Sequence, residues 1–240
     1  MRWLVATVAE TVPETVHTTT LRVDVPLWPG HRAGQHADVR LTADDGYQAQ
    51  RSYSIASAPG AEPLELTVAR IDDGEVSPYL TTVADVGDQF ELRGPIGGWF
   101  VWDGDDSTPV LMVGGGSGVV PLMAMMRHHA NTGSTAAMHL VYSARSFDDV
   151  IYRDELAGLA DGGHRALTLT LTRSAPPGWT GYRGRVDRQM LGDVAWPPVV
   201  RPRCYVCGPT PFVEAVGAAL VELGHEPNRV KTERFGPTGE

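Results

Sequence analysis

The chain has 240 residues, of which 42% are hydrophobic and 20% charged, and its formal net charge is −9. These values exclude a mini-protein, a collagen-like repeat and a disordered chain, and they argue against nucleic-acid binding, which depends on a basic surface. The sequence contains no apolar run of about 20 residues and no secretory leader, so we expect a soluble, cytoplasmic protein without a membrane partner.

The first hundred residues predict short strands separated by turns. Turn sequences such as Asp44-Asp45-Gly46 and Asp72-Asp73-Gly74 punctuate stretches in which several apolar and polar residues alternate. Examples of the expected strands are residues 19–25, 35–41, 64–70 and 89–93. This pattern is typical of an antiparallel barrel or sandwich, and we expect a first domain over residues 1–105.

From residue 106 onward, strand and helix patterns alternate. Strands are expected at 109–113, 138–143, 167–172, 204–207 and 230–234, and helices at 119–129, 151–159, 187–191 and 211–223. Strand after helix after strand implies a doubly wound parallel sheet over residues 106–240. Functional groups on such a sheet gather at the carboxyl ends of the strands.

A glycine-rich turn follows the first of these strands. Gly114-Gly115-Gly116-Ser117-Gly118 leads from an apolar strand into a helix, so backbone N–H groups and the helix N-terminus could bind a pyrophosphate. The spacing is close to G-x-G-x-x-G but departs from it at Val119, and the Lys of a phosphate-binding P-loop is absent. A structural turn before a buried helix is the alternative.

A second candidate feature is Arg51-Ser52-Tyr53-Ser54, at the expected end of a barrel strand. An arginine offers a bidentate fork to phosphate, a tyrosine offers a flat face to an aromatic ring, and a serine hydroxyl can bond to a ring nitrogen. Arg51 and Tyr53 project to the same side of the strand. Taken alone, the four residues could equally belong to a solvated strand.

Six motifs occur in order along the chain. They are Arg51-Ser52-Tyr53-Ser54, Gly74-Glu75-Val76-Ser77-Pro78-Tyr79-Leu80, Gly94-Pro95-Ile96-Gly97, the glycine turn up to Pro121, Cys207-Gly208-Pro209 and Glu233-Arg234-Phe235-Gly236. Together they resemble the signature of the ferredoxin-NADP reductase superfamily, and within it the reductase components of bacterial oxygenases. The resemblance implies an antiparallel flavin-binding β-barrel followed by an α/β NAD(P)-binding domain. It also implies an oxidoreductase that passes hydride from NADPH to FAD and then single electrons to a separate acceptor.

The resemblance assigns the strand motif to the flavin. It implies that Arg51 pairs with the pyrophosphate, that Tyr53 packs on the isoalloxazine ring, and that Ser54 bonds near N5, with Ser52 beside them. The loop residues Gly74, Val76 and Ser77 would supply backbone N–H groups and a hydroxyl to the flavin phosphates. A plain turn before a short helix is the alternative for this loop, and FMN is the alternative to FAD.

The second domain would bind the nicotinamide dinucleotide. The resemblance places the pyrophosphate on Gly115, Gly116, Ser117 and Gly118. NAD sites prefer a carboxylate at the end of the second strand. Here that strand ends in Tyr142-Ser143-Ala144-Arg145, which contains no acidic residue. Arg145, Arg173 and Arg185 match the 2′-phosphate pocket of NADPH-using members, so NADPH is favoured over NADH. Each arginine could instead be an ordinary surface residue. Tyr152 is a candidate for stacking on the adenine.

Two cysteines, Cys204 and Cys207, are too few for an iron–sulfur or four-thiolate zinc site. On an extended strand their side chains lie on opposite faces, which disfavours a disulfide. The resemblance implies that Cys207, with Gly208 and Pro209, lies against the nicotinamide ring, and Cys204 is expected in the core.

The last motif supplies two further candidates. By resemblance, Phe235 covers the flavin face and moves aside for the nicotinamide, while Glu233 lies near the flavin and can relay protons. A plain core role is the alternative for Phe235. The histidines lack the spacing of a metalloenzyme, so no metal is expected.

Many relatives continue beyond this motif into a plant-type ferredoxin domain, whereas this sequence ends at Glu240. We therefore expect no [2Fe–2S] cluster and an acceptor on another protein, either a ferredoxin or an oxygenase component. Three alternatives remain: a free flavin or ferric reductase, an electron-transfer subunit that is inactive outside a complex, and a nucleotide-sensing module without flavin.

Overall fold

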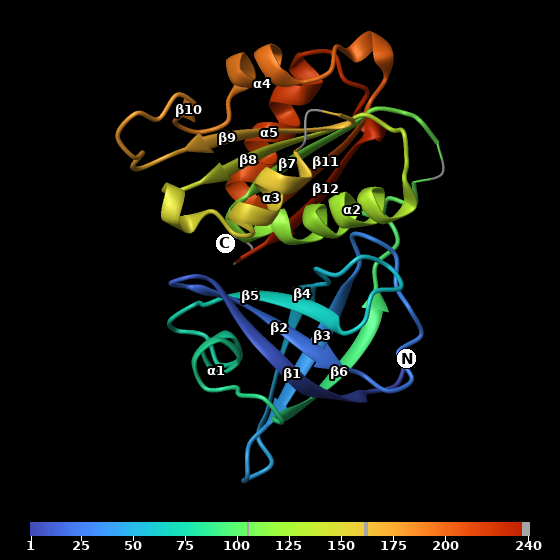
Figure 1. Ribbon diagram of the computed structural model, residues 1–240, viewed down its shortest axis with the longest axis vertical. Helices are drawn as coiled ribbons and strands as arrows, with labels where there is room; N and C mark the ends of the chain where they lie inside the picture. Colours follow the sequence, from blue (N-terminus) through green and yellow to red (C-terminus); the bar gives the residue numbers. More distant parts are fainter. Residues whose placement is uncertain (105, 161–162, 237–240) are drawn as a thin grey trace. The chain divides into compact units, whose positions relative to one another are not determined.

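The structure is a computed structural model that describes residues 1–104, 106–160 and 163–236. It contains two compact units (Figure 1): unit 1 comprises Met1–Asp103 together with Met123–His128, and unit 2 comprises Gly104–Leu122 and the chain from His129 onward. The expected domain boundary after residue 105 stays a prediction, because that residue lies outside the described ones. In the described part of the chain, no helix has the length and apolar character needed to cross a membrane.

Unit 1 is a six-stranded antiparallel sheet in the order β4-β3-β6-β1-β2-β5. Its elements are β1 (Leu4–Thr15), β2 (Thr18–Asp24), β3 (His36–Thr42), β4 (Gln48–Ser54), β5 (Leu64–Ala69), α1 (Ser77–Thr82) and β6 (Gln89–Ile96). Just beyond β4, Ile55 pairs with Leu66 of β5, and the Ala56 N–H donates to the Glu65 carbonyl at 2.8 Å. These bonds join the two edge strands, so the expected antiparallel barrel is confirmed.

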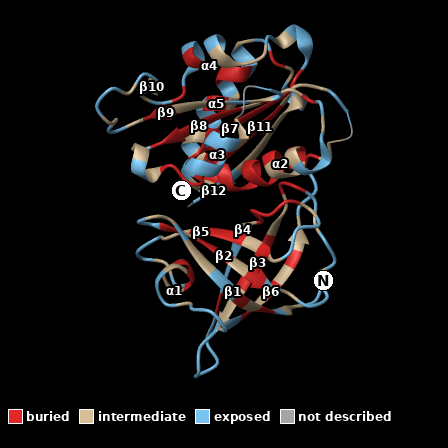
Figure 2. Ribbon diagram, viewed as in Figure 1, coloured by how far each residue is buried: buried red, intermediate tan, exposed pale blue. Residues whose placement is uncertain are grey.

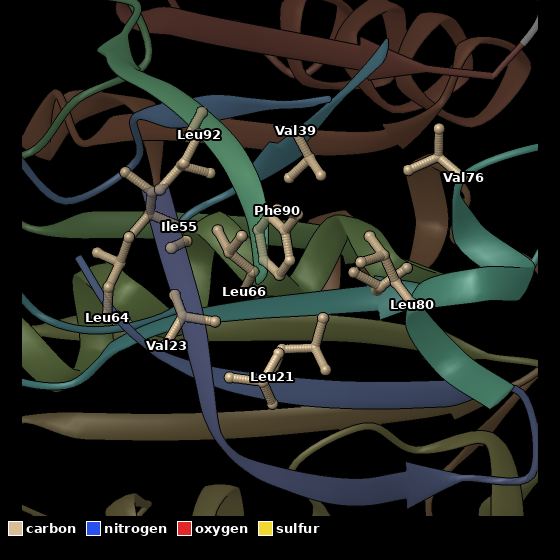
Figure 3. Packing of buried hydrophobic residues seen from close by; sticks show 14 of the residues in the cluster. Leu21, Val23, Val39, Ile55, Leu64, Leu66, Val76, Leu80, Phe90 and Leu92 are labelled. Carbon is tan, nitrogen blue, oxygen red and sulfur yellow. The ribbon is translucent and has the colours of Figure 1, made fainter. Parts of the chain in front are cut away.

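The barrel core follows from the two-residue period of its strands. Leu21 and Val23 on β2 and Phe90 and Leu92 on β6 alternate with more exposed neighbours, and all four are buried. Figure 3 shows them packed together, with Leu80 of α1 nearby. Burying each large side chain stabilises the fold by roughly 1.5–3 kcal/mol, so the alternation selects which face of each strand turns inward.

Unit 2 is a parallel sheet in the order β10-β9-β8-β7-β11-β12. Its strands are β7 (Val110–Gly115), β8 (Met138–Ala144), β9 (Arg165–Leu171), β10 (Tyr182–Arg183), β11 (Arg203–Pro209) and β12 (Val230–Phe235). Its α-helices are α2 (Val119–Thr132), of which part groups with unit 1, α3 (Arg153–Leu159), α4 (Arg188–Val194) and α5 (Thr210–Glu222). The doubly wound fold class expected from the sequence is confirmed.

The central strand β7 lies where the strand order reverses. From β7 the chain proceeds outward through β8 and β9 to β10, and it then returns to the other side of β7 as β11. All six residues of β7 are buried, which Figure 2 shows as a continuous red strand. Ligands of open α/β sheets bind at such a reversal, outside the carboxyl ends of the strands.

Two strands and one helix start differ from the sequence expectation. No strand was predicted over β1, which contains Pro13, or over the two-residue β10. The helix expected from residue 151 begins at Arg153. Tyr152 has a φ of +58°, which is a left-handed conformation. Such a residue cannot be part of a right-handed helix, so the helix begins after it.

The segment Met123–His128 of α2 packs as a part of unit 1. One Arg127 nitrogen, Nη1, donates to Glu65 Oε2 at 2.6 Å and to the Ala56 carbonyl at 2.8 Å. Glu65 also accepts from Arg22 Nε at 2.9 Å. The side chains of Arg127 and Glu65 are only 16% and 14% exposed, so this ion pair is little screened by solvent.

We predict that Arg127→Ala destabilises unit 1 by about 1–3 kcal/mol, because it leaves the Ala56 carbonyl and one Glu65 oxygen without their hydrogen bonds in a partly buried site. Urea unfolding followed by circular dichroism measures this change. Arg201→Ala is the matched control, since it removes an exposed ion pair with Glu226 and should change the unfolding free energy by less than about 1 kcal/mol. Equal losses in the two variants would contradict the prediction.

Candidate functional site

The turn between β7 and α2 is shaped by glycine. Gly116 is exposed and has a φ of +56°, a left-handed conformation that favours glycine. A Cβ added to Gly118 would overlap the carbonyl oxygen of Cys207 and lie 2.7 Å from the nitrogen of Gly208. The turn therefore lies directly on the backbone at the end of β11, and only glycine permits this approach.

The ring of Phe212, on α5, fills the space beside the two turns. A Cβ on Gly115 would lie 2.9 Å from Phe212 Cδ1, and one on Gly208 would lie 2.7 Å from the same atom. The two glycines and the ring thus form one layer. Nothing in the sequence distinguished Phe212 from an ordinary apolar residue of α5.

Strand register aligns several predicted residues at the carboxyl edge of the sheet. Gly115 pairs with Ser143 of β8, and Cys207 of β11 pairs with Gly114 on one side and with Glu233 of β12 on the other. One step further, Pro209 pairs with Phe235, which is 37% exposed at the end of β12. The structure therefore gathers residues that lie up to 121 positions apart in the sequence.

Both cysteines are buried and free, so no disulfide forms between Cys204 and Cys207. Cys204 belongs to the core beneath α4 and α5, where burial raises its pKa to about 12, as expected for a core residue. Burial, reinforced by the nearby Glu233 carboxylate, raises the pKa of Cys207 well above its usual range. The Cys207 thiol is thus protonated and neutral at physiological pH.

Arginines gather at the carboxyl ends of β8, β9 and β10. Arg173 donates its N–H to the Arg145 carbonyl at 2.8 Å, and Arg183 pairs with Leu171 two residues before Arg173. Arg185 follows the short strand β10. All four arginines are exposed, and none forms an ion pair with a residue that the structure describes. This corner of the sheet is suited to a phosphate.

Arg183 was not predicted, although its two-residue spacing from Arg185 was visible in the sequence. On an extended segment that spacing places both side chains on the same face. The signal was missed because two residues of β10 are too short for a strand pattern.

Tyr152 is only 3% exposed in this structure. Its stacking on an adenine stays a prediction. The rings of Phe147 and Trp179 lie 5.8 Å apart and are both partly exposed, and the Arg153 guanidinium lies 5.2 Å from the Phe147 ring. The two rings are inclined at 59° to each other, and the sequence analysis did not single them out; Phe147 follows Arg145 by two residues.

In unit 1 the structure brings the β4 motif together with the loop before α1. Arg51 Nη2 lies 3.3 Å from Glu75 Oε2, and the Tyr47 hydroxyl donates to Glu75 Oε1 at 2.5 Å. Arg51 and Tyr53 are two residues apart in β4, so they project from the same face of the strand, and Tyr47 immediately precedes the strand. Sequence reasoning gave no role to Tyr47 or Glu75.

The loop supplies fewer free N–H groups than the resemblance implied. The Gly74 N–H donates to the Ile71 carbonyl at 2.8 Å, so it is already used inside the turn. The contribution of Gly74 is its missing side chain, since a Cβ would lie 3.0 Å from that carbonyl oxygen. No described residue accepts a hydrogen bond from the N–H groups of Val76 or Ser77.

The remaining strand residues differ in environment. Tyr53 is half-buried against the barrel core, and burial raises its pKa to about 12, so its hydroxyl stays protonated. The Ser54 hydroxyl bonds to no described residue, whereas Ser52 donates to Asp38 Oδ1 at 2.6 Å. Arg93 binds the other oxygen of Asp38 at 2.6 Å. Burial alone would raise the pKa of Asp38, but the bonds from Ser52 and Arg93 outweigh it and lower that pKa.

Ser52 therefore anchors β4 to the barrel wall, and Arg51, Tyr53 and Ser54 are the strand residues left to face a ligand. In unit 1 the groups that remain accessible are the Arg51 guanidinium, the Ser54 hydroxyl and the half-buried Tyr53 ring, which fit an aromatic molecule that carries phosphates. In unit 2 a glycine cradle lies at the strand reversal, with the four arginines at the carboxyl ends of the strands on one side of it, which fits a dinucleotide. Within the described residues, no group of three or more metal-ligating side chains is present.

We predict that Gly118→Ala destabilises unit 2 by about 1–3 kcal/mol, because the new methyl group overlaps backbone atoms that cannot rotate away. Thermal and urea unfolding measure the change. Gly217→Ala is the control, since its helix position has open space around it, and alanine should leave stability unchanged or raise it by up to about 1 kcal/mol. Tolerance of Gly118→Ala at full stability would show that the two turns are not in contact.

Comparisons with known proteins agree with this geometry. Residues 6–101 match the family of oxidoreductase FAD-binding domains, and residues 112–217 match the family of oxidoreductase NAD-binding domains. The FAD/NAD-binding domain of a nitric oxide dioxygenase from Vibrio cholerae has the same fold. Its TM-score is 0.86 at 23% identity, and the alignment covers 98% of this chain and 99% of that one.

Two curated relatives share more of the sequence. Ferredoxin--NADP reductase B of Sorangium cellulosum is 36% identical over 213 residues, which cover 85% of this chain and 84% of the relative. The glycine betaine monooxygenase reductase subunit of Pseudomonas aeruginosa is 33% identical over 226 residues, which cover 93% of this chain and 61% of the relative. The 240 residues thus align with less than two thirds of that subunit. With an FAD-binding and an NAD-binding oxidoreductase domain in one chain, the protein belongs to the ferredoxin-NADP reductase superfamily.

Proposed function

We propose that the protein is an NADPH-dependent flavoprotein reductase that holds FAD in unit 1 and NADPH in unit 2 and passes electrons to a separate protein. The observation that carries the NADPH assignment is the group of four arginines without carboxylate partners at the ends of β8–β10. A 2′-phosphate distinguishes NADPH from NADH, and it requires such cations where an NAD site places an acid.

When bound, the flavin supplies the means to accept a hydride from a reduced nicotinamide and to release its electrons one at a time. The residues of the chain would bind the flavin and orient it. Arg51 would pair with the flavin pyrophosphate together with the Val76 and Ser77 N–H groups, and the Tyr53 ring would stack on the isoalloxazine. The Ser54 hydroxyl, which has no partner among the described residues, would donate a hydrogen bond near N5.

In unit 2 the backbone of Gly115–Gly118 would bind the nucleotide pyrophosphate, and the protonated Cys207 thiol would give the nicotinamide a neutral, apolar wall. A thiol held in this state is a poor nucleophile, so it would not attack the electrophilic oxidised ring. Phe235, exposed at the end of β12, would shield the flavin until the nicotinamide arrives. Glu233 would relay protons near the flavin.

Two relatives suggest the class of acceptor. One is named as a ferredoxin–NADP reductase and the other as the reductase subunit of a monooxygenase. We therefore propose a ferredoxin or an oxygenase component as the acceptor of this chain. The free thiols of Cys204 and Cys207 suit the reducing cytoplasm that we propose as its location.

The first test is the absorbance spectrum of the purified protein, followed by anaerobic titration with NADPH and with NADH. Flavin bands near ~450 nm should be bleached by NADPH at lower concentrations than by NADH, because of its additional phosphate contacts. A colourless protein that takes up no FAD would contradict the proposed function. A flavin that is lost on desalting and consumed during turnover would instead indicate a free flavin reductase.

We predict that Arg145→Ala combined with Arg173→Ala raises the KM for NADPH by about tenfold to a hundredfold, the effect of losing charge-assisted hydrogen bonds to one phosphate. The KM for NADH should change by less than about twofold, since NADH lacks that phosphate. Steady-state kinetics with both nucleotides check this.

Arg188→Ala is the control for the arginine variants. It removes an exposed arginine of the same unit that lies 3.9 Å from Glu222, away from the carboxyl edge. Its KM values should match those of the parent protein. An equal loss with NADPH and NADH in the double variant would rule out the 2′-phosphate assignment.

A further inference from the structure

The loop before α1 contains a carboxylate in contact with the proposed anion-binding arginine. Glu75 is bound through both oxygens, one to the Tyr47 hydroxyl at 2.5 Å and one to Arg51 Nη2 at 3.3 Å. Arg51 projects from the face of β4 that also carries Tyr53, and Tyr47 immediately precedes the strand. Glu75 therefore occupies the position on Arg51 where a phosphate oxygen would otherwise bind, because guanidinium groups recognise the two anions through the same geometry.

The ion pair between Arg51 and Glu75 is weak enough to be broken by a ligand. The side chains of Arg51 and Glu75 are 54% and 49% exposed, and their separation is long for an ion pair. Arg51 directs its other terminal nitrogen to the Gln50 carbonyl at 2.7 Å, so it does not grip Glu75 with a bidentate fork. Exposed pairs of this kind contribute at most about 1 kcal/mol. In contrast, Arg93 binds Asp38, whose side chain is only 8% exposed.

We propose that Glu75 sets the affinity for FAD by competing, as an internal anion, with the flavin pyrophosphate for Arg51. This inference rests on the proposed function, which places the pyrophosphate on Arg51. For FAD to bind, Glu75 must leave the guanidinium, and its negative charge then remains beside two phosphate charges of the same sign. Both effects weaken FAD binding, and neither acts on the uncharged isoalloxazine ring.

The test measures FAD binding to the full chain freed of flavin, by quenching of flavin fluorescence at low ionic strength. Glu75→Gln keeps an oxygen that accepts from Tyr47 and removes the charge. It should lower the Kd for FAD by about two- to fivefold, in keeping with an exposed pair, and the gain should shrink as salt is added. The Kd for riboflavin, which has no phosphate, should not change.

Asp73→Asn is the matched control. Asp73 lies in the same loop and is exposed, and its side chain bonds to no described residue, so the variant changes the net charge equally without touching Arg51. It should lower the Kd for FAD by less than half as much as Glu75→Gln. An effect of equal size in the two variants would overturn the proposal, since it would show general repulsion rather than competition for Arg51.

Arg51→Gln separates this inference from the proposed function. If Arg51→Gln weakens FAD binding and Glu75→Gln has a clearly smaller effect in that background than in the parent protein, competition at Arg51 is supported. If Arg51→Gln weakens FAD binding but Glu75→Gln alone leaves the Kd unchanged or raises it, Glu75 is not a competitor and only this inference fails. If Arg51→Gln leaves the Kd for FAD unchanged, the pyrophosphate is not on Arg51 and the proposed flavin site fails with it.

Discussion

The contact between Gly118 and the backbone of Cys207 and Gly208 determines how the carboxyl edge of unit 2 is built. It brings the turn after β7 against the end of β11, the two strands between which the chain order reverses. A side chain at Gly118 would force these strands apart, and the Phe212 ring beside Gly115 and Gly208 would lose its fit. The exposed, left-handed Gly116 is then free to present backbone N–H groups outward. The same absence of side chains thus serves packing on one side and binding on the other.

Ion pairs in unit 1 divide by exposure, and the division corresponds to their roles. Glu65 is held by Arg127 and Arg22 in a partly buried site, where separating the charges from their partners is costly. Asp38 likewise fixes β4 through Ser52 while Arg93 binds its other oxygen. These contacts hold the barrel in one geometry. The exposed pair of Arg51 with Glu75 can open at little cost, and an arginine in such a pair remains available to a ligand.

The four arginines of unit 2 extend this distinction. Most other arginines of the described chain have a carboxylate partner, whereas these four form no ion pair with a described residue, and all four follow or end strands at the carboxyl edge of β8–β10. Exposed cations at one edge of a sheet, without carboxylate partners among the described residues, favour the binding of an anion. Groups of like-charged residues that do not stabilise the fold are expected at functional sites.

The sequence was sufficient for the features that depend on local chemistry. Apolar and polar residues alternate over 89–93 and predicted β6, while an unbroken apolar run over 110–113 predicted β7. Both signals are local, because successive side chains of a strand point to opposite faces of the sheet. Six ordered motifs identified the superfamily. Spacing alone also showed that Cys204 and Cys207 lie on opposite faces of a strand and form no disulfide.

Contacts between distant segments required the tertiary structure. Three environments became visible only in the structure, and none has a signature in the neighbouring sequence: the burial of Tyr152, the use of the Gly74 N–H by Ile71 and the bond of Ser52 to Asp38. Glu75 and Arg51 are 24 positions apart, and Gly118 and Cys207 are 89 apart. The sequence by itself determined which residue types could bind phosphates and an aromatic ring. Only the fold decided which of them are free to do so, because the packing of remote strands and turns assigns each polar group either a partner within the protein or an open face.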